Sequence, residues 1–393
     1  MKWDYTTLGV ISASIQTGPF GSQLHQSDYS ENGIPVVMPK DLVGGKISTE
    51  SIAKVAEIHV ERLSRHKIKE GDILYSRRGD VGRCAFASKN ETNWLCGTGC
   101  LRVTLTQDKA NPRFIYYQLQ TANSVGWVEK HAVGSTMLNL NTSILSALPI
   151  ILPPLNIQKR IADILSAYDN IIENNQKQIK LLEEAAQRLY KEWFIDLRFP
   201  GHENIPIHDG VPEGWEKKRL VDIADVQYGF AFDGSLFNST GNGMPIIRIR
   251  NIPSGTTDDY TTETADEQFV VKNGDIVVGM DGEFHINSWC GEDAYLVQRT
   301  CRIKPYDSNM NGWLLRAIYE PIKFFEKTVV GATVAHLGKK HIDTIQLLAA
   351  PNRYYEPFTV FFEKRQTLLK QNHKLAEARD CLLPKLMNGE IKA

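Results

Sequence analysis

The sequence predicts an α+β fold. Two similar domains of mixed α/β structure, in an inverted pseudo-twofold arrangement, are separated by two long antiparallel helices that form a coiled coil. Two long stretches of helical periodicity predict the helices. A series of short motifs that recurs in the two halves of the 393-residue chain predicts the two domains.

The first periodic stretch runs from Ile161 to Trp193, where apolar residues recur in alternating steps of four and three. This spacing forms a narrow apolar seam of the kind that packs lengthwise against a second helix. At about 1.5 Å per residue, the seam is about 48 Å long, so it requires an equally long partner. The predicted helix-pairing residues of this stretch are Ile161, Leu165, Ile172, Asn175, Ile179, Leu182 and Leu189.

The second periodic stretch, residues 356–387, is the predicted partner. A shift of 197 residues places Asn175 on Asn372. A polar residue in an apolar seam sets the register of two helices when it meets another polar group. The two asparagines therefore predict that the helices pack on each other, and a solvent-facing position for either of them is the alternative. The predicted helix-pairing residues here are Phe358, Phe362, Leu369, Asn372 and Leu386.

The composition is ordinary for a globular protein, with 42% hydrophobic and 23% charged residues. No stretch approaches the 18 or more apolar residues of a membrane span, and the N-terminus lacks the profile of a signal peptide. Six cysteines lie at scattered positions, and Cys96 and Cys100 have no second Cys or His pair to complete a zinc set. We therefore expect a cytoplasmic chain with reduced thiols, no membrane contact and no metal.

The two halves of the chain repeat the same motifs in the same order. Residues 33–37 match 243–247, 69–74 match 272–277, and 100–102 match 301–303, which makes Cys100 equivalent to Cys301. The offset shrinks along the chain, so loops change length while the scaffold persists, and recognition usually resides in loops. The predicted boundaries are 1–153 for the first domain, 154–197 for the central helix, 198–350 for the linker and second domain, and 351–393 for the distal helix.

Short strands bounded by Gly, Pro or Asp are expected in each half, together with a flanking helix. The expected strands include 34–38, 73–75 and 101–105 in the first half and 246–249, 276–278 and 300–303 in the second. The flanking helices are expected at 111–121 and 311–326.

Three features together carry a resemblance to a known family. They are the turn Thr17-Gly18-Pro19-Phe20-Gly21-Ser22, the loop Ser76-Arg77-Arg78-Gly79-Asp80-Val81-Gly82 after a strand, and Leu152-Pro153-Pro154-Leu155-(x)2-Gln158 before the first long helix. In their order, and duplicated with the helices, they resemble the DNA-specificity (S) subunit of Type I restriction–modification systems over essentially all 393 residues. The second half departs from the pattern at 227–232, at 278–283 and at Asn352-(x)2-Tyr355.

The resemblance implies a non-catalytic protein whose two target-recognition domains each read one half of a split site in double-stranded DNA. It also implies that the paired helices set the spacing between the halves and dock two methyltransferase subunits, which two motor–nuclease subunits can join. No cofactor is expected in this chain, because the resemblance places S-adenosylmethionine, ATP and Mg²⁺ only in the partner subunits.

Recognition of DNA needs cations for phosphates and forked or amide side chains for base edges. Residues 1–153 contain 16 Lys and Arg against 13 Asp and Glu, a net charge of +3, whereas residues 213–351 contain 14 against 19, a net charge of −5. Much of the negative charge comes from an acidic run at 258–267, which we place on a face away from DNA. Local clusters of charge therefore matter more than the sum.

Residue type and position in the repeat select the candidate DNA contacts. In the first half they are Ser22, Gln23, Lys40, Arg77, Arg78, Arg83 and Thr136. In the second half they are Tyr228, Arg248, Arg250, Asn251, Asp281, Glu283, His285 and Thr333. Each has an alternative: a solvated loop for the arginines of 77–83, a salt-bridged strand face for 248–251, core packing for Tyr228, and catalysis or metal binding for Glu283 with His285.

Two other functions fit parts of the pattern. A stand-alone DNA-modifying enzyme would need a glycine-rich cofactor turn and an (Asn/Asp/Ser)-Pro-Pro-(Tyr/Phe) loop, but Leu152 and Leu155 flank the only Pro-Pro pair. The chain also lacks a phosphate-binding Gly-(x)4-Gly-Lys-(Ser/Thr) motif. A coiled-coil assembly scaffold that does not bind DNA would enrich no sequence from random oligonucleotides.

Overall fold

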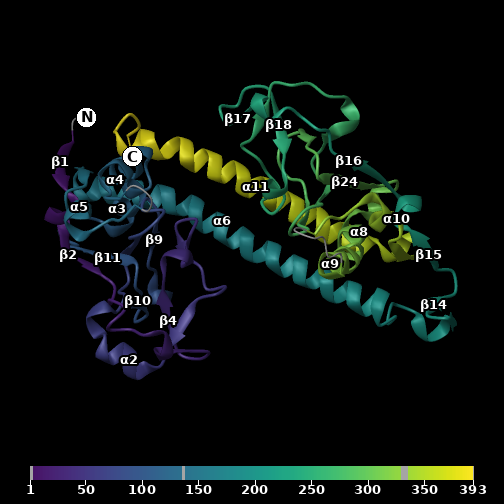
Figure 1. Cartoon of the computed structure of the whole chain (residues 1–393), viewed down its shortest axis with the longest axis horizontal. Helices are drawn as coiled ribbons and strands as arrows, with labels where there is room; N and C mark the ends of the chain where they lie inside the picture. The colour runs from purple at the N-terminus through teal and green to yellow at the C-terminus, as the bar shows by residue number, and fades with distance from the viewer. Residues whose placement is uncertain (1–2, 135–137, 329–334, 393) are drawn as a thin grey trace. The chain divides into compact units, whose positions relative to one another are not determined.

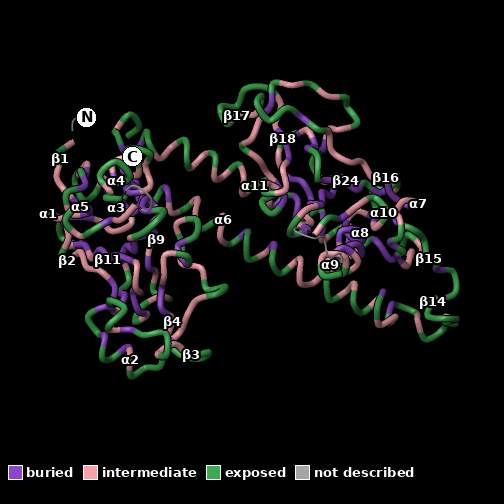
Figure 2. The backbone as a smooth tube through the Cα atoms, viewed as in Figure 1, coloured by how far each residue is buried: buried purple, intermediate pink, exposed green. Residues whose placement is uncertain are grey.

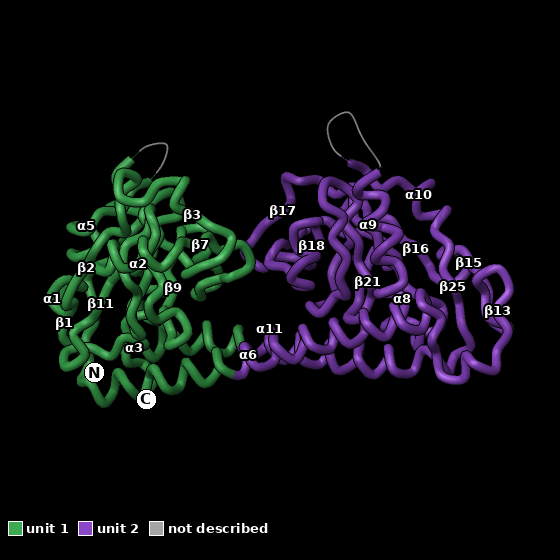
Figure 3. The backbone as a smooth tube through the Cα atoms, turned by 90° about the horizontal axis from the view of Figure 1, so that it is seen from below, with its two compact units in different colours: residues 1–170, 376–393 green, residues 171–375 purple. Residues whose placement is uncertain are grey.

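The computed structural model describes residues 3–134, 138–328 and 335–392 (Figure 1). The chain divides into two compact units, residues 1–170 with 376–393 (unit 1) and residues 171–375 (unit 2), as Figure 3 shows. Two long helices, α6 (Leu155–Tyr190) and α11 (Glu356–Met387), each contribute to both units.

Unit 1 is built on two sheets. One is antiparallel, with the strand order β2-β11-β8-β9, and the other has the order β10-β4-β7-β3 with a parallel pairing between β10 and β4. The strands are β1 Asp4–Thr7, β2 Ser12–Thr17, β3 Tyr29–Ser30, β4 Ile34–Val37, β5 Leu42–Val43, β6 Lys46–Ile47, β7 Ala53–Val55, β8 Ile73–Ser76, β9 Cys84–Phe86, β10 Leu95–Cys96, β11 Cys100–Leu105 and β12 Pro149–Leu152. The shorter helices are α1 Leu8–Ile11, α2 Glu57–Arg62, α3 Pro112–Leu119, α4 Ala122–His131 and α5 Thr142–Ser146.

The main core of unit 1 lies between the antiparallel sheet, the helix α3 and the ends of both long helices (Figure 2). All four residues of β8 are buried, as expected for a central strand. Ile161 and Leu165 of α6 belong to this core together with Leu386 and Met387 of α11. The ends of the predicted seam are thus part of a domain core as well as a helix–helix contact.

The start of α6 is held by a buried amide. Gln158 is fully buried, its Oε1 accepts a hydrogen bond from Asn111 N at 2.8 Å, and its Nε2 donates to Pro153 O at 2.7 Å. Asn111 in turn caps α3, because its Oδ1 accepts from Phe114 N at 3.0 Å. The Pro-Pro-Leu-(x)2-Gln motif therefore ties the first turn of α6 to the first turn of α3.

Unit 2 repeats this plan. Its antiparallel sheet has the order β16-β24-β21-β22, and its second sheet has the order β17-β19-β18-β23-β20. The strands are β13 Ile207–His208, β14 Val211–Pro212, β15 Glu216–Arg219, β16 Ala224–Tyr228, β17 Phe237–Asn238, β18 Met244–Ile247, β19 Tyr260–Thr261, β20 Val270–Val271, β21 Ile276–Gly279, β22 Ile286–Ser288, β23 Ala294–Leu296, β24 Thr300–Pro305 and β25 Gln346–Ala349. The shorter helices are α7 Leu220–Ile223, α8 Asn311–Ala317, α9 Tyr319–Thr328 and α10 Lys339–Asp343.

Two expected elements of unit 2 have different boundaries in the structure. The single helix expected at 311–326 is two helices, α8 and α9, separated at Ile318. Pro321 has no N–H to continue the ladder of α8, but it fits the first turn of a new helix, where the N–H needs no partner. The strand expected at 246–249 ends at Ile247, and Ile249–Asn251 forms a 3-10 turn.

The sheet register corrects the alignment of the two halves. Leu74 pairs with Arg102 in unit 1, and its equivalent Val277 pairs with Arg302 in unit 2. Arg102 is therefore equivalent to Arg302, and Cys100 to Thr300, so the expected match of Cys100 with Cys301 is wrong by one residue. A shift of one residue moves a strand side chain to the opposite face, so the two cysteines face different layers. All six cysteines lie within the described residues and are free thiols.

Within each unit the long helices run antiparallel and make polar contacts across the seam. In unit 2, Asn175 Nδ2 donates to Asn372 Oδ1 at 2.9 Å, so the two seam asparagines bind each other. In unit 1, Arg379 Nη1 donates to Asp169 Oδ1 at 2.6 Å. Among the described residues, no helix combines the length and the apolar character that crossing a membrane requires.

Candidate nucleic-acid interface

The arginine-containing loop 77–83 follows β8 and is held by three backbone hydrogen bonds. Arg77 N donates to Gly99 O at 2.8 Å, Gly79 N donates to Leu138 O at 3.0 Å, and Leu140 N donates to Arg77 O at 2.8 Å. Gly79 has a φ of +72°, a left-handed conformation that favours glycine. The backbone of this loop is therefore determined by contacts from two other segments of the chain.

The loop 280–286 of unit 2 has the same frame. Met280 N donates to Arg299 O at 2.9 Å, Gly282 N donates to Ala335 O at 3.1 Å, and Leu337 N donates to Met280 O at 2.7 Å. Gly282 has a φ of +69°, close to that of its equivalent Gly79. The two halves thus place different side chains on one backbone arrangement.

Of the three predicted arginines of loop 77–83, two have a guanidinium that is not engaged by a carboxylate within the described part of the chain. Arg77 lies 6.0 Å from the centre of the Phe20 ring, and Arg78 is exposed. Arg83 instead binds Asp80 of its own loop, with Nε and Nη2 at 3.0 and 2.8 Å from Oδ2. Arg77 and Arg78 are therefore the stronger candidates for contact with DNA.

The other predicted contacts of the first half lie in short turns. Gln23 Oε1 accepts a hydrogen bond from Phe20 N at 3.1 Å, so this amide closes the turn, while Ser22 is exposed. A Cβ atom on Gly18 would lie 2.0 Å from Gly97 O, which explains the glycine in this turn. Lys40 is not at the end of a strand but in a 3-10 turn, where its Nζ donates to Ser51 O at 3.0 Å.

Sequence reasoning missed Asn139, which lies next to Arg78. The two residues form an isolated antiparallel bridge, and Asn139 Oδ1 is buried without a hydrogen-bond partner within the described residues. An amide can bind an adenine edge in two places, so this position suits recognition. A polar residue between Leu138 and Leu140 was the available signal. The predicted contacts Thr136 and Thr333 lie outside the described residues.

In the second half, the cluster at 248–251 folds onto an acidic residue. Arg250 forms an ion pair with Asp259, and Asn251 Nδ2 donates to Asp259 Oδ2 at 3.2 Å. The acidic run was expected to lie away from the DNA face, but its member Asp259 binds two of the candidate contacts, so these two expectations conflict. Arg248 lies 5.7 Å from the centre of the Phe237 ring.

Asp281 stands where unit 1 has Arg78, and it binds two cationic or ionisable side chains. Arg299 Nη1 lies 2.9 Å from Asp281 Oδ2, and His336 Nδ1 lies 2.5 Å from Asp281 Oδ1. Neither Arg299 nor His336 was selected from the sequence, because each is distant from Asp281 along the chain. Their equivalence to Gly99 and Asn139 emerges only from the backbone hydrogen bonds.

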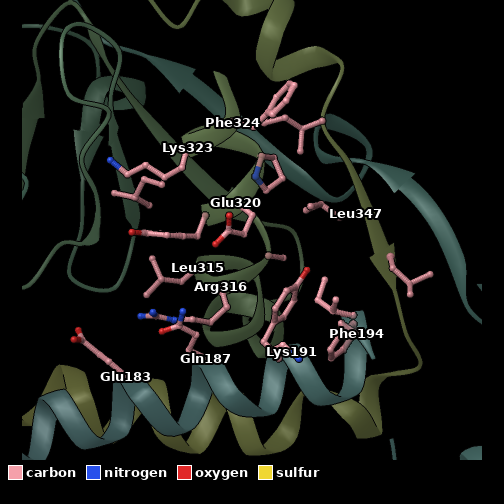
Figure 4. Close-up of a pocket in the computed structure, with 18 of the residues that line it drawn as sticks. Glu183, Gln187, Lys191, Phe194, Leu315, Arg316, Glu320, Lys323, Phe324 and Leu347 are labelled. Carbon is pink, nitrogen blue, oxygen red and sulfur yellow. The ribbon is translucent and has the colours of Figure 1, made fainter. Parts of the chain in front are cut away.

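Glu283 and His285 occupy a different place from Asp281. They line an open groove of about 1700 Å³ in unit 2. Side chains of α6, α8, α9 and β25 also line this groove (Figure 4). Glu283 Oε1 lies 3.6 Å from His285 Nδ1. In residues 3–134, 138–328 and 335–392, no group of three His, Cys, Asp or Glu side chains is arranged to hold a metal ion.

Charged side chains of α6 and of α8 and α9 face each other across this groove (Figure 4). Lys323 Nζ donates to Glu326 Oε2 at 2.7 Å, and Arg365 Nε donates to Glu183 Oε1 at 2.6 Å. Burial lowers the pKa of Arg316, and the carboxylate of Glu183 opposes that shift. The groove is thus lined by both charged and apolar side chains, most of them from helices.

Tyr228 is half-buried at the end of β16, and burial raises the pKa of its hydroxyl. Its Oη is buried without a hydrogen-bond partner within the described residues. The ring therefore packs in the domain, in line with the alternative of core packing.

The family model for the Type I restriction modification DNA specificity domain matches residues 2–184 and 212–348. The chain belongs to this family. The two matched stretches coincide with the two sets of sheets and with the duplicated loop frame described above, so the repeat is a duplication of the specificity domain.

Similar proteins span nearly the whole chain. The Type I restriction enzyme MjaIX specificity subunit of Methanocaldococcus jannaschii is 28% identical over 385 residues, which cover 93% of this chain and 88% of that protein. The HindI specificity subunit of Haemophilus influenzae is 22% identical over 99% of each chain. The crystal structure of the Type I S subunit from M. genitalium has a TM-score of 0.59 at 17% identity, and it covers 98% of this chain and 96% of that one.

These matches identify the chain as a DNA sequence specificity subunit of the Type I restriction–modification class, not an enzyme. The likeness to the M. genitalium structure shows that the two proteins share a fold. DNA and a methyltransferase are the partners that this class implies.

Proposed function

We propose that each unit of this chain reads one half of a bipartite, asymmetric DNA site, and that α6 and α11 set the unread gap between the halves. The observation that carries this proposal is the duplicated loop frame, which carries Arg77 and Arg78 in unit 1 but the buried Met280 and the ion-paired Asp281 in unit 2. Equal frames with different side chains are suited to reading different bases in a related geometry.

The same symmetry supports docking of two identical methyltransferase subunits. A duplicated chain offers two similar surfaces, and a pair of like surfaces accommodates two copies of one partner. Two motor–nuclease subunits join this complex in our proposal. We assign S-adenosylmethionine, ATP and Mg²⁺ to those partners, as the family resemblance implies. The Gly-(x)4-Gly-Lys-(Ser/Thr) motif of a phosphate-binding loop does not occur in this sequence.

Methylome mapping of cells with and without this chain tests the proposal directly. The expected result is one split motif, with a fixed gap, that is methylated only when the chain is present. Replacement of residues 198–350 by those of another specificity subunit should change one half of the motif and leave the other half intact. Methylation of an uninterrupted motif, or transfer of methyl groups by the isolated chain, would contradict the proposal.

The role of the helices is tested by inserting seven helix-forming residues at two matched points, between Asn170 and Ile171 and between Leu375 and Ala376. Both points lie at the boundary between the units, so the polar seam contacts inside each unit remain. Seven residues add about 10 Å of helix, or about three base pairs at about 3.4 Å each. We expect a longer gap with unchanged half-sites. Insertion in α6 alone should prevent correct pairing, and an unchanged gap after the matched insertion would exclude the spacing role.

A further inference from the structure

Arg299 has an unusual backbone conformation for an arginine. Its φ is +68°, in the left-handed region that side chains other than glycine rarely adopt. The equivalent residue in unit 1 is Gly99, with a φ of +89°. Both carbonyl groups accept the equivalent backbone hydrogen bond, from Met280 N at 2.9 Å in unit 2 and from Arg77 N at 2.8 Å in unit 1. The position requires a left-handed backbone, and unit 2 places an arginine there at the cost of strain.

Packing does not compensate for this strain. The side chain of Arg299 is 66% exposed, and its partner Asp281 is 16% exposed. Ion pairs with one exposed member contribute little to stability. Strained backbone conformations of this kind cluster at functional sites, where the surrounding structure maintains them.

The carboxylate of Asp281 holds two side chains at once. Its Oδ2 binds Arg299, and its Oδ1 lies 2.5 Å from Nδ1 of His336, which is 59% exposed. Each oxygen of Asp281 thus engages one of these two side chains, and the Asp281 side chain itself is only 16% exposed. The two exposed side chains that it orients are the groups that can reach a ligand.

The three positions have direct counterparts in unit 1. Asp281, His336 and Arg299 take the places of Arg78, Asn139 and Gly99 in the shared backbone frame. In unit 1 the loop carries the arginine, Arg78, and the residue before β11 is Gly99. In unit 2 the loop carries the acidic residue Asp281, and the residue before β24 is the arginine, Arg299. In unit 1 Arg78 pairs with Asn139 across a backbone bridge, and in unit 2 Arg299 and His336 share the carboxylate of Asp281. Asn and His both have donor and acceptor capacity.

We propose that Arg299 is a specificity-determining residue of the second half, that it binds a guanine in the major groove, and that Asp281 is the positioning residue that orients it. An arginine fork matches guanine O6 and N7, and a fork that is already held loses less side-chain entropy on binding. This inference rests on the proposed function of unit 2 in reading one half of a split site.

The test uses the full chain in complex with its methyltransferase subunits and reads the motif by methylome mapping. Arg299→Gly removes the fork and fits the left-handed backbone, so the variant should fold with an equal or higher thermal midpoint. We expect discrimination for guanine at one position of the second half-site to fall by about ten- to one-hundredfold, the range that a forked contact supplies. The first half-site should stay unchanged.

Three further variants sharpen the result. Arg299→Lys keeps the charge but loses the fork, so methylation should persist with relaxed recognition of the same position. Asp281→Asn should cause a smaller loss at that position, because the guanidinium remains but is no longer anchored. Arg219→Ala removes a comparably exposed arginine of unit 2 that is paired with Asp222, and the motif should not change.

An Arg299→Gly complex that methylates the wild-type motif with undiminished discrimination would overturn the inference. So would a uniform loss of methylation at all sites with no change of motif, since that is the signature of a phosphate contact. Failure of the proposed function is a separate outcome, because the wild-type chain itself would then produce no split motif.

Discussion

The two units secure the same antiparallel helix seam with different chemistry. Unit 2 uses Arg365, which is only 7% exposed and donates hydrogen bonds to Glu183, Asn287 and Ser288 at 2.6, 2.7 and 2.5 Å. Unit 1 uses Asp169, a partly exposed carboxylate that accepts from Tyr117 at 2.5 Å and from Arg379 at 2.6 Å. The geometry of the seam is thus common to both units, whereas the polar contacts that stabilise it are particular to each.

The same separation between frame and side chain occurs at the two loops. The hydrogen bonds that hold loops 77–83 and 280–286 are matched donor for donor, yet their exposed side chains differ in charge. Backbone hydrogen bonds and left-handed glycines do not depend on side-chain identity, so a duplicated domain can keep them while its recognition residues diverge.

The largest loss of stability is expected when the seam arginines Arg365 and Arg379 are replaced. Arg365→Met should lower the free energy of opening of the helix pair in unit 2 by about 3 kcal/mol, because it leaves Glu183 and two polar side chains without their partner. Arg379→Met should cost unit 1 less, about 1.5 kcal/mol, because its ion pair is more exposed. Hydrogen exchange of the α11 amides in each unit measures both. Equal losses of opening free energy in the two variants would show that the burial of the arginine does not determine how much its contacts stabilise the helix pair.

The asparagine pair distinguishes register from stability. Asn175→Ala should lower the opening free energy of unit 2 by about 1 to 2 kcal/mol, since Asn372 loses its side-chain partner. Replacement of both residues by leucine should restore or increase stability, but it removes the polar contact that specifies one register. Hydrogen exchange measures the first effect, and cross-links between cysteines placed on the two helices measure the second. If the variant with leucine at both positions were less stable than Asn175→Ala, the asparagine pair would not act mainly on register.

The smallest effect is expected at the two loop glycines. Gly79→Ala and Gly282→Ala should each cost about 1 kcal/mol of local stability, because both residues have a positive φ and a Cβ would meet nothing within 4 Å. The strain is purely conformational, so the two losses should be equal. Chemical denaturation of the chain, monitored by hydrogen exchange near each loop, tests this equality. A marked difference between them would mean that the two frames are less alike than their hydrogen bonds indicate.

The helices and the repeat were predictable because their signals are periodic and local. The seam from Ile161 to Trp193 and the matched glycines at 33 and 243 are visible in the printed residues alone. The boundaries of small elements were less predictable: the chain breaks at Ile318, before Pro321, into two helices where one was expected at 311–326. The alignment of Cys100 with Cys301 was wrong because it matched two residues of the same type. The pairing of the strands, which the sequence does not reveal, makes Cys100 equivalent to Thr300.

The candidate site was predictable in its location but not in its members. Arg77 and Arg78 could be selected because they are adjacent in a glycine-containing loop. Arg299 and His336 could not, because folding brings them to Asp281 from other segments and isolated polar residues carry no periodic signal. Asn139 had only a weak signal, its place between two leucines. The ion pairs of Arg250 with Asp259 and of Asp281 with Arg299 likewise join separate segments.

The sequence by itself determined the duplication, the long helices and the class of protein, because apolar periodicity and ordered motifs persist along the chain. Only the tertiary structure decided which charged side chains neutralise one another and which remain exposed. The physical reason is distance: a charge interacts with whatever lies within a few ångströms, and folding brings residues to that distance regardless of their separation in sequence.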